Sequence, residues 1–191
     1  TKTSKQFNNL SNEKSDSEDV RTDLFELIKE LSGAGIKYVV CGGVACVLQG
    51  VERATYDLDI SVKFDNENID KIIEVADKFN LIPRIPEPVE ALKDEIKRRN
   101  WLEKKGALVY TFVSKKTPLQ LDIFLSYPRS YEELFENADE LVIDDIKFKV
   151  SSIEDLIFVK KHIEPMRDKD LTDIKELEII YEQKNKSVKR S

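Results

Sequence analysis

The 191-residue sequence has one histidine, two cysteines, one methionine and one tryptophan. A Ser-His-Asp or Cys-His catalytic arrangement would have to use His162, which stands on an expected helix and is interpreted as a partly exposed surface residue. Cys41 and Cys46 have no second pair or histidine cluster to complete a zinc site, so we expect two buried thiols rather than a disulfide. These shortages argue against histidine-dependent nucleophilic catalysis and against structural zinc.

Long apolar runs and an excess of positive charge are also missing. No run approaches the roughly 18 apolar residues of a membrane span, and residues 1–20 contain no hydrophobic segment of the signal-peptide type. The sequence therefore predicts a soluble, cytoplasmic protein. Its formal net charge of −6 argues against a large unspecific nucleic-acid surface, while a local basic patch stays compatible with nucleic-acid binding.

The chain divides into three expected parts. Residues 1–18 are rich in Ser, Asn, Lys and acidic residues, which predicts a disordered lead-in. A helix is expected to start near residues 17–19, because apolar residues then recur at helical spacing: Val20, Leu24, Leu27, Ile28 and Leu31. We expect one folded domain over residues 19–183 and a basic tail over residues 184–191.

Strand-like and helix-like segments then alternate. Buried or alternating apolar patterns predict strands over residues 36–41, 55–64, 107–114 and 119–126, and a hairpin over 140–150. Helical periodicity predicts helices over residues 44–50, 66–80, 130–138, 151–163 and 168–183. Prolines 83, 86 and 88 mark a break. The fold class is α/β (α+β), a small mixed β-sheet flanked by helices, with further helices at the C-terminal end.

A basic segment surrounds the single tryptophan, Trp101. It contains Lys93, Lys97, Arg98, Arg99, Lys104 and Lys105. Two interpretations stay open: the cations and the aromatic ring bind RNA or ATP, or the segment is a solvated helix.

Two Asp-x-Asp triplets occur, and only one of them is predicted to form a site. Asp57 and Asp59 stand on an expected strand, where residues two apart point to the same face and the intervening Leu58 points into the core. Asp168 and Asp170 stand at an expected helix start, where such positions diverge by about 200° around the axis. The first pair therefore predicts converging carboxylates.

Converging carboxylates repel each other unless a cation neutralises them, and Mg²⁺ prefers such oxygen ligands. Asp122 is a third carboxylate on an expected strand, with Leu121 and Ile123 facing the other way. Three acids on two neighbouring strands predict a site for two metal ions, as used in phosphoryl and nucleotidyl transfer.

Gly42 and Gly43 lie between an expected strand and a short helix. Small residues there let a phosphate approach the backbone N–H groups at the start of the helix. The alternative is a tight turn beside a solvated acidic strand, which leaves Asp122 on an otherwise apolar strand unexplained.

The combined pattern resembles the DNA polymerase beta-like nucleotidyltransferase superfamily. Its signature is a Gly-Gly or Gly-Ser, a gap of nine to thirteen residues, an acid-hydrophobic-acid-hydrophobic run and a later acid. The chain is most similar to the small stand-alone members, namely the toxin-type nucleotidyltransferases of abortive-infection and toxin–antitoxin systems and the aminoglycoside nucleotidyltransferases. The matched positions in the first part are Gly42, Gly43, Ala45, Gly50, Arg53, Thr55, Asp57 and Asp59. Those in the C-terminal part are Lys160, Arg167, Lys169, Asp170 and Asp173.

The resemblance implies a nucleotidyltransferase fold and assigns roles to these residues. Asp57, Asp59 and Asp122 are expected to be the catalytic and metal-binding residues. The nucleotide-binding residues are expected to be Gly42, Gly43, Arg53, Thr55 and Lys160. Lys160 is alternatively an exposed helix lysine, and Arg53 a structural ion pair; for Asp170 and Asp173 we expect ion pairs with Arg167 or Lys169.

The sequence therefore predicts a Mg²⁺-dependent nucleotidyltransferase that moves a nucleoside monophosphate from an NTP to a hydroxyl and releases pyrophosphate. Two Mg²⁺ ions and the NTP are the expected ligands. The acceptor is left open between an RNA end such as tRNA, a hydroxyl side chain of a partner protein and an aminoglycoside. The alternative function is a nucleotide-binding but non-catalytic partner or antitoxin-like module.

Overall fold

The computed structural model describes the backbone of residues 16–188 and the side chains of residues 23–187. Its helices are α2 (Asp16–Gly33), α3 (Gly42–Gln49), α4 (Asn66–Lys78), α5 (Glu95–Lys105), α6 (Tyr131–Asn137), α7 (Ile153–Lys161), α8 (Asp168–Val188) and the 3₁₀ helix η1 (Val89–Lys93). Its strands are β1 (Tyr38–Cys41), β2 (Asp57–Val62), β3 (Leu81–Pro83), β4 (Val109–Ser114), β5 (Gln120–Phe124), β6 (Asp139–Ile143) and β7 (Ile146–Val150). In this part of the chain, no helix is both long enough and apolar enough to cross a membrane.

All of these strands join one mixed sheet in the order β3-β4-β5-β2-β1-β7-β6. Strands β2 and β5 are parallel neighbours, as are β1 and β7, and the other pairs are antiparallel. The expected mixed α/β fold is confirmed. The central position of β2 and β5 brings distant parts of the sequence together in the middle of the sheet.

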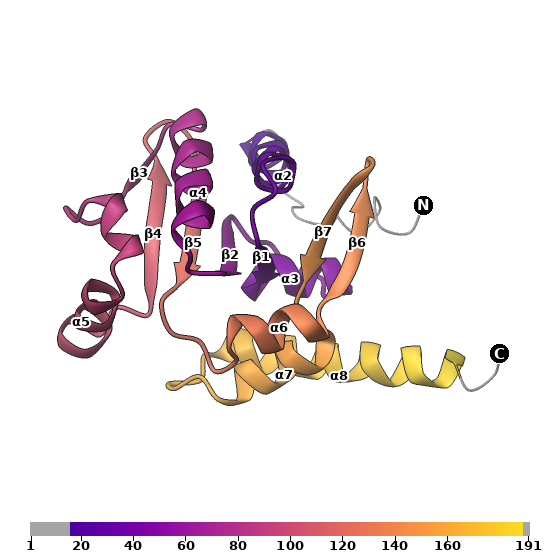
Figure 1. Ribbon diagram of the computed structural model, residues 1–191. Helices are drawn as coiled ribbons and strands as arrows, with labels where there is room; N and C mark the ends of the chain where they lie inside the picture. Colours follow the sequence, from indigo (N-terminus) through magenta and orange to yellow (C-terminus); the bar gives the residue numbers. More distant parts are fainter. Residues whose placement is uncertain (1–15, 189–191) are drawn as a thin grey trace.

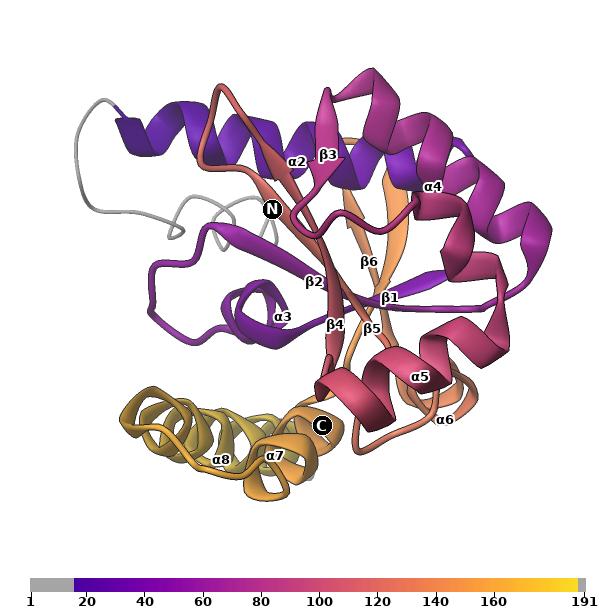
Figure 2. The same ribbon diagram turned by 90° about the vertical axis from the view of Figure 1, so that its left-hand side faces the viewer.

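Helices cover both faces of this sheet (Figure 1). Figure 2 separates α2 and α4, above the central strands, from α3, α7 and α8, below them. The described apolar residues of the first expected helix face, from Leu24 to Leu31, are fully buried in the main core with Leu58 and Ile60 of β2. Val20 lies outside the described side chains. Asp57 and Asp59 alternate with Leu58 and Ile60 along β2 and so point to the opposite face, where Asp59 lies against Gly42 at the start of α3.

Both expected hairpins form. Strands β4 and β5 pair with Thr111 opposite Asp122, and β6 pairs with β7. The second hairpin turns at Asp144 and Asp145, whose φ angles of 47° and 66° are left-handed. Aspartate tolerates this conformation, and two consecutive positive φ values suit the twist of a tight hairpin.

The structure differs from the expected elements at the proline-rich break and at the two ends. Leu81–Pro83 pairs with β4 as an edge strand, where a proline is tolerated because its missing N–H need not join a ladder. Helix α2 begins at Asp16, and α8 continues to Val188, past the expected end at residue 183. Residues 1–15 of the expected lead-in and 189–191 of the expected tail lie outside the described residues.

The cysteines, the histidine and the tryptophan, which are rare in this chain, pack against other parts of the fold. Cys41 and Cys46 are free and buried, as expected, and burial raises the pKa of Cys46 to about 12. His162 is exposed at the end of α7, where its ring stacks on Phe158. Trp101 is buried against Tyr110, so its ring is withdrawn from any ligand on the surface of α5. The buried ring therefore has no part in either interpretation of the basic segment, whose cations Lys97, Arg99, Lys104 and Lys105 are exposed.

Candidate active site

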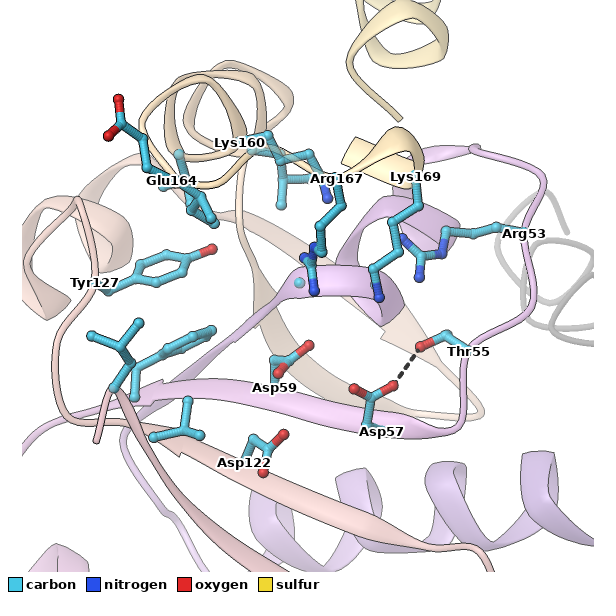
Figure 3. Close-up of a pocket in the computed structure, with 18 of the residues that line it drawn as sticks. Arg53, Thr55, Asp57, Asp59, Asp122, Tyr127, Lys160, Glu164, Arg167 and Lys169 are labelled. Atoms are coloured by element: carbon cyan, nitrogen blue, oxygen red, sulfur yellow. Dashed lines mark hydrogen bonds between the residues drawn. The ribbon is translucent and has the colours of Figure 1, made fainter. Parts of the chain in front are cut away.

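Three carboxylates converge on the sheet face that α2 and α4 leave uncovered. Asp57 and Asp59 come from β2, and Asp122 comes from the adjacent parallel strand β5, where it lies directly opposite Asp59. One carboxylate oxygen from each of the three lies within 4.8 Å of the others. Figure 3 shows the three side chains pointing into one pocket. The predicted grouping of these acids is therefore present.

The electrostatics of this cluster favour a cation. Burial, followed by the neighbouring carboxylates of Asp57 and Asp122, raises the pKa of Asp59 to about 7. The Gly43 backbone N–H bonds to Asp59 and acts in the opposite direction. Closely spaced carboxylate oxygens are the ligands that Mg²⁺ takes, so the donor set fits a divalent cation.

The backbone at Gly42 and Gly43 approaches Asp59 and Thr55 so closely that a larger side chain would not fit. Gly42 has a φ of +59°, and a Cβ placed on it would lie 2.0 Å from Asp59 Oδ2. A Cβ on Gly43 would lie 2.7 Å from Thr55 Oγ1. Only glycine accepts both the left-handed backbone and the close approach at residue 42. The start of α3 is thereby held against the carboxylates.

Thr55 contacts the acid cluster directly. Its Oγ1 donates a hydrogen bond to Asp57 Oδ1 at 3.1 Å. Thr55 is buried, and both Thr55 and Asp57 line the cavity. The observed contact orients Asp57.

Cations line the wall of the pocket that faces the acids. They are Arg53, Lys160, Arg167 and Lys169 (Figure 3). The side chains of Arg167 and Lys169 point toward Asp59 and Asp57 in this view. A cavity of about 430 Å³ separates the two walls, and a volume of this size accommodates a small-molecule ligand.

The interpretation of Lys160 as an exposed helix lysine is wrong, because its side chain is only 7% exposed. Its Nζ lies 3.0 Å from Asp170 Oδ1 and 2.7 Å from Asp173 Oδ2. Burial of an ammonium group requires such partners. Lys160 is therefore held between two carboxylates while it lines the cavity.

The same two carboxylates hold the two arginines. Arg53 Nη1 lies 2.6 Å from Asp173 Oδ2, so the ion-pair alternative for Arg53 is present in the structure, although the residue also lines the cavity. Arg167 Nε lies 2.7 Å from Asp170 Oδ2, as expected for that acid. Lys169, the other expected partner, makes no ion pair with any described residue. The structure leaves its charge available to a ligand.

The second Asp-x-Asp triplet does not contribute to the acid cluster. Asp168 is exposed at the first residue of α8, and Asp170 is fully buried beneath Lys160 and Arg167. Although burial acts to raise the pKa of Asp170, hydrogen bonds from Arg167 and Lys160 hold it well below the usual value. The predicted contrast between the two triplets is confirmed.

Part of the cavity lining is apolar and was not predicted from the sequence. Its lining includes Leu108, Val109, Phe124, Tyr127, Leu156, Val159, Ile163 and Pro165. Phe124 and Tyr127 stack with ring centroids 4.0 Å apart. The sequence carries no signal for this wall, because apolar residues at strand and helix ends are equally typical of a core.

Comparison with known proteins agrees with this geometry. The family model described as "Nucleotidyl transferase AbiEii toxin, Type IV TA system" matches residues 26–179. No curated protein sequence matches the chain.

Solved structures share the fold at low sequence identity. The lincomycin-bound lincosamide antibiotic adenylyltransferase LnuA is 19% identical, with a TM-score of 0.56 over 83% of this chain and 96% of that chain. The antibiotic-resistance factor ANT(2'')-Ia is 11% identical, with a TM-score of 0.52 over 92% of this chain and 97% of that chain. At these identities the likeness concerns the fold alone.

Proposed function

The chain belongs to the AbiEii family of nucleotidyltransferase toxins of type IV toxin–antitoxin systems, and from this premise we propose that it transfers a nucleoside monophosphate from an NTP to an acceptor hydroxyl. The observation that carries the proposal is the register of β2 and β5, which puts Asp122 opposite Asp59. Residues 19–183 form the proposed catalytic domain.

Asp57, Asp59 and Asp122 are the proposed ligands of two Mg²⁺ ions. When bound, the ions neutralise phosphate charge and lower the pKa of the acceptor hydroxyl. The ionised carboxylates supply the charge that holds them. The convergence of one carboxylate oxygen from each residue within 4.8 Å of the others supports this assignment.

The proposed nucleotide site lies between the glycine turn and the cationic wall. Gly42 and Gly43 let the triphosphate approach the backbone at the start of α3. Lys169 and Arg167 point toward the acids (Figure 3) and are proposed to contact the phosphates directly. The proposed role of Arg53 and Lys160 is to add positive charge to this wall, since ion pairs with buried carboxylates already hold both side chains.

The reaction forms one bond and breaks one bond. The acceptor oxygen attacks the α-phosphorus, and the bond from the α-phosphorus to the oxygen bridging to the β-phosphate breaks. Pyrophosphate leaves with that electron pair, and the hydroxyl proton passes to Asp122. Thr55 orients Asp57 throughout, through its 3.1 Å hydrogen bond.

The acceptor class stays open between an RNA end, a protein hydroxyl and a small antibiotic. The structural relatives described as a lincosamide adenylyltransferase and an antibiotic-resistance factor keep the antibiotic in this set. The apolar residues of the cavity lining, among them the ring pair of Phe124 and Tyr127, support a flat or apolar group in the acceptor.

The test is incubation with each labelled NTP, Mg²⁺ and a mixture of total RNA, lysate and aminoglycosides, followed by measurement of pyrophosphate and of the labelled acceptor. Asp57→Asn and Asp122→Asn should reduce release to background, because each removes a charge from the cluster. Asp168→Asn is the matched control and should keep nearly full activity, since Asp168 is exposed and outside the cavity. Pyrophosphate release by neither the parent nor the control would favour a non-catalytic binding module.

A further inference from the structure

Side chains hold both oxygens of the Asp122 carboxylate. Thr111 Oγ1 donates to Asp122 Oδ1 at 2.6 Å, and Gln120 Nε2 donates to Asp122 Oδ2 at 2.8 Å. Thr111 lies opposite Asp122 in the β4–β5 pair, and Gln120 precedes it by two residues on β5. The two donors therefore reach the carboxylate from the neighbouring strand and from the same face of its own strand.

The orientation of the Gln120 amide depends on a third side chain. Arg84 Nη2 donates to Gln120 Oε1. Arginine has only donors, so the carbonyl end of the amide must face Arg84 and the NH₂ end must face Asp122. The backbone N–H of Arg84 in turn donates to the Thr111 carbonyl oxygen at 2.9 Å. The contacts form a continuous chain of hydrogen bonds from the exposed Arg84 to the buried Asp122. We call Arg84, Gln120 and Thr111 with these bonds the relay.

This relay constrains the carboxylate plane. A carboxylate oxygen has two lone-pair sites, and each hydrogen bond occupies one of them, which leaves one site on each oxygen of Asp122 for a ligand. Rotation of the carboxylate would break both bonds, and bonds to an ionised acceptor are about twice as strong as neutral ones. The side chain of Asp122 is thus oriented before any ligand binds.

We propose that Thr111, Gln120 and Arg84 are positioning residues that hold Asp122 in the orientation needed to bind a divalent cation and accept the acceptor proton. This inference rests on the proposed function. None of the three lines the cavity, so they act through Asp122 rather than on the nucleotide. Their removal should therefore change kcat and cation affinity without changing the KM for the NTP.

Cation binding is measured directly by titrating the full chain with Mn²⁺ and following free Mn²⁺ by electron paramagnetic resonance. Thr111→Val should weaken Mn²⁺ binding and lower kcat by about tenfold, the effect of one hydrogen bond to a charged group. Thr111→Ser keeps the hydroxyl and should restore both. Arg84→Ala should lower both by about fivefold, a smaller effect than that of Thr111→Val because the Arg84 bond is exposed and reaches Asp122 only through Gln120, whereas Arg84→Lys keeps a charged donor and should retain them.

Arg99→Ala is the matched control for Arg84. Arg99 is also an exposed arginine with one side-chain partner, Glu95 on α5, and lies outside both the cavity and the relay. Its removal should change neither kcat nor Mn²⁺ affinity. An equal loss in Arg99→Ala and Arg84→Ala would show a general effect of surface charge and overturn the relay.

A double-mutant cycle separates positioning from a structural effect. In the Asp122→Asn background, where Asp57 and Asp59 remain as ligands, Thr111→Val should leave Mn²⁺ affinity unchanged. Weakening by the same factor in both backgrounds would overturn the inference. A parent that binds Mn²⁺ but releases no pyrophosphate would contradict the proposed function, while the cycle would still decide the relay. A parent that binds no Mn²⁺ would contradict both.

Discussion

Asp59→Asn is expected to stabilise the metal-free protein at pH 8. The carboxyl group has its pKa raised from 3.8 to about 7 by burial and by Asp57 and Asp122. Asparagine has nearly the same shape, and its carbonyl oxygen can still accept the Gly43 N–H. The substitution therefore removes the half-buried negative charge and keeps the packing.

The size of this effect follows from the pKa change. Three pKa units correspond to about 4 kcal/mol, and solvent in the open cavity reduces the expected gain to about 2–4 kcal/mol. Because the folded pKa lies above the unfolded one, ionisation costs stability progressively as pH rises from about 4 to about 7, and the cost is constant above that. The gain should thus be full at pH 8 and only about a third as large at pH 5.

The assay is thermal and urea unfolding of parent and variant at pH 5 and pH 8, with EDTA and with Mg²⁺. A gain of 2–4 kcal/mol corresponds to a rise in Tm of roughly 5–15 °C for a protein of this size. Mg²⁺ should stabilise the parent more than Asp59→Asn, because the variant has lost one charged ligand. An unchanged or lower Tm for the variant at pH 8 with EDTA would refute the electrostatic reasoning, and so would an equal gain at pH 5.

Two further substitutions test the walls of the cavity. Gly42→Ala should cost about 1–3 kcal/mol and abolish stabilisation by Mg²⁺ in thermal melts, because φ is +59° and the new Cβ would lie 2.0 Å from Asp59 Oδ2; a parent-like Mg²⁺ shift would contradict this. Lys160→Met should cost about 1–3 kcal/mol in urea unfolding, because it removes one charged hydrogen-bond donor from each of two buried carboxylates, which keep Arg167 and Arg53 as partners. Lys169→Ala, which breaks no ion pair with a described residue, should stay within about 0.5 kcal/mol of the parent and weaken NTP binding in titrations. Equal stability losses for both lysine variants would contradict the different roles assigned to them.

Local patterns were sufficient for most elements of the fold. The period-two spacing of Leu58 and Ile60 predicted which face of β2 is buried, and the turn residues Asp144 and Asp145 predicted a hairpin. The edge strand Leu81–Pro83 was missed, because three residues ending in proline carry no strand signal until β4 pairs with them. Such short strands depend on a neighbour rather than on their own propensity.

The candidate site was predicted in part. The glycine turn and the three acids could be identified because each requires a particular residue type at its position. The ion pairs of Lys160 with Asp170 and Asp173 could not be predicted, because an amphipathic helix pattern does not say which polar residue is buried against another helix. The apolar wall with Phe124 and Tyr127 was missed for the related reason that a cavity wall and a core have the same composition.

By itself the sequence determined that Asp57 and Asp59 project from one face of a strand, since that follows from the backbone geometry of any β-strand. Only the tertiary structure decided that Asp122, more than sixty residues later, lies beside Asp59, and that Thr111, Gln120 and Arg84 hold it. The pairing of β2 with β5 depends on how the whole sheet buries its apolar faces. That choice is a property of the packed chain and not of any one segment.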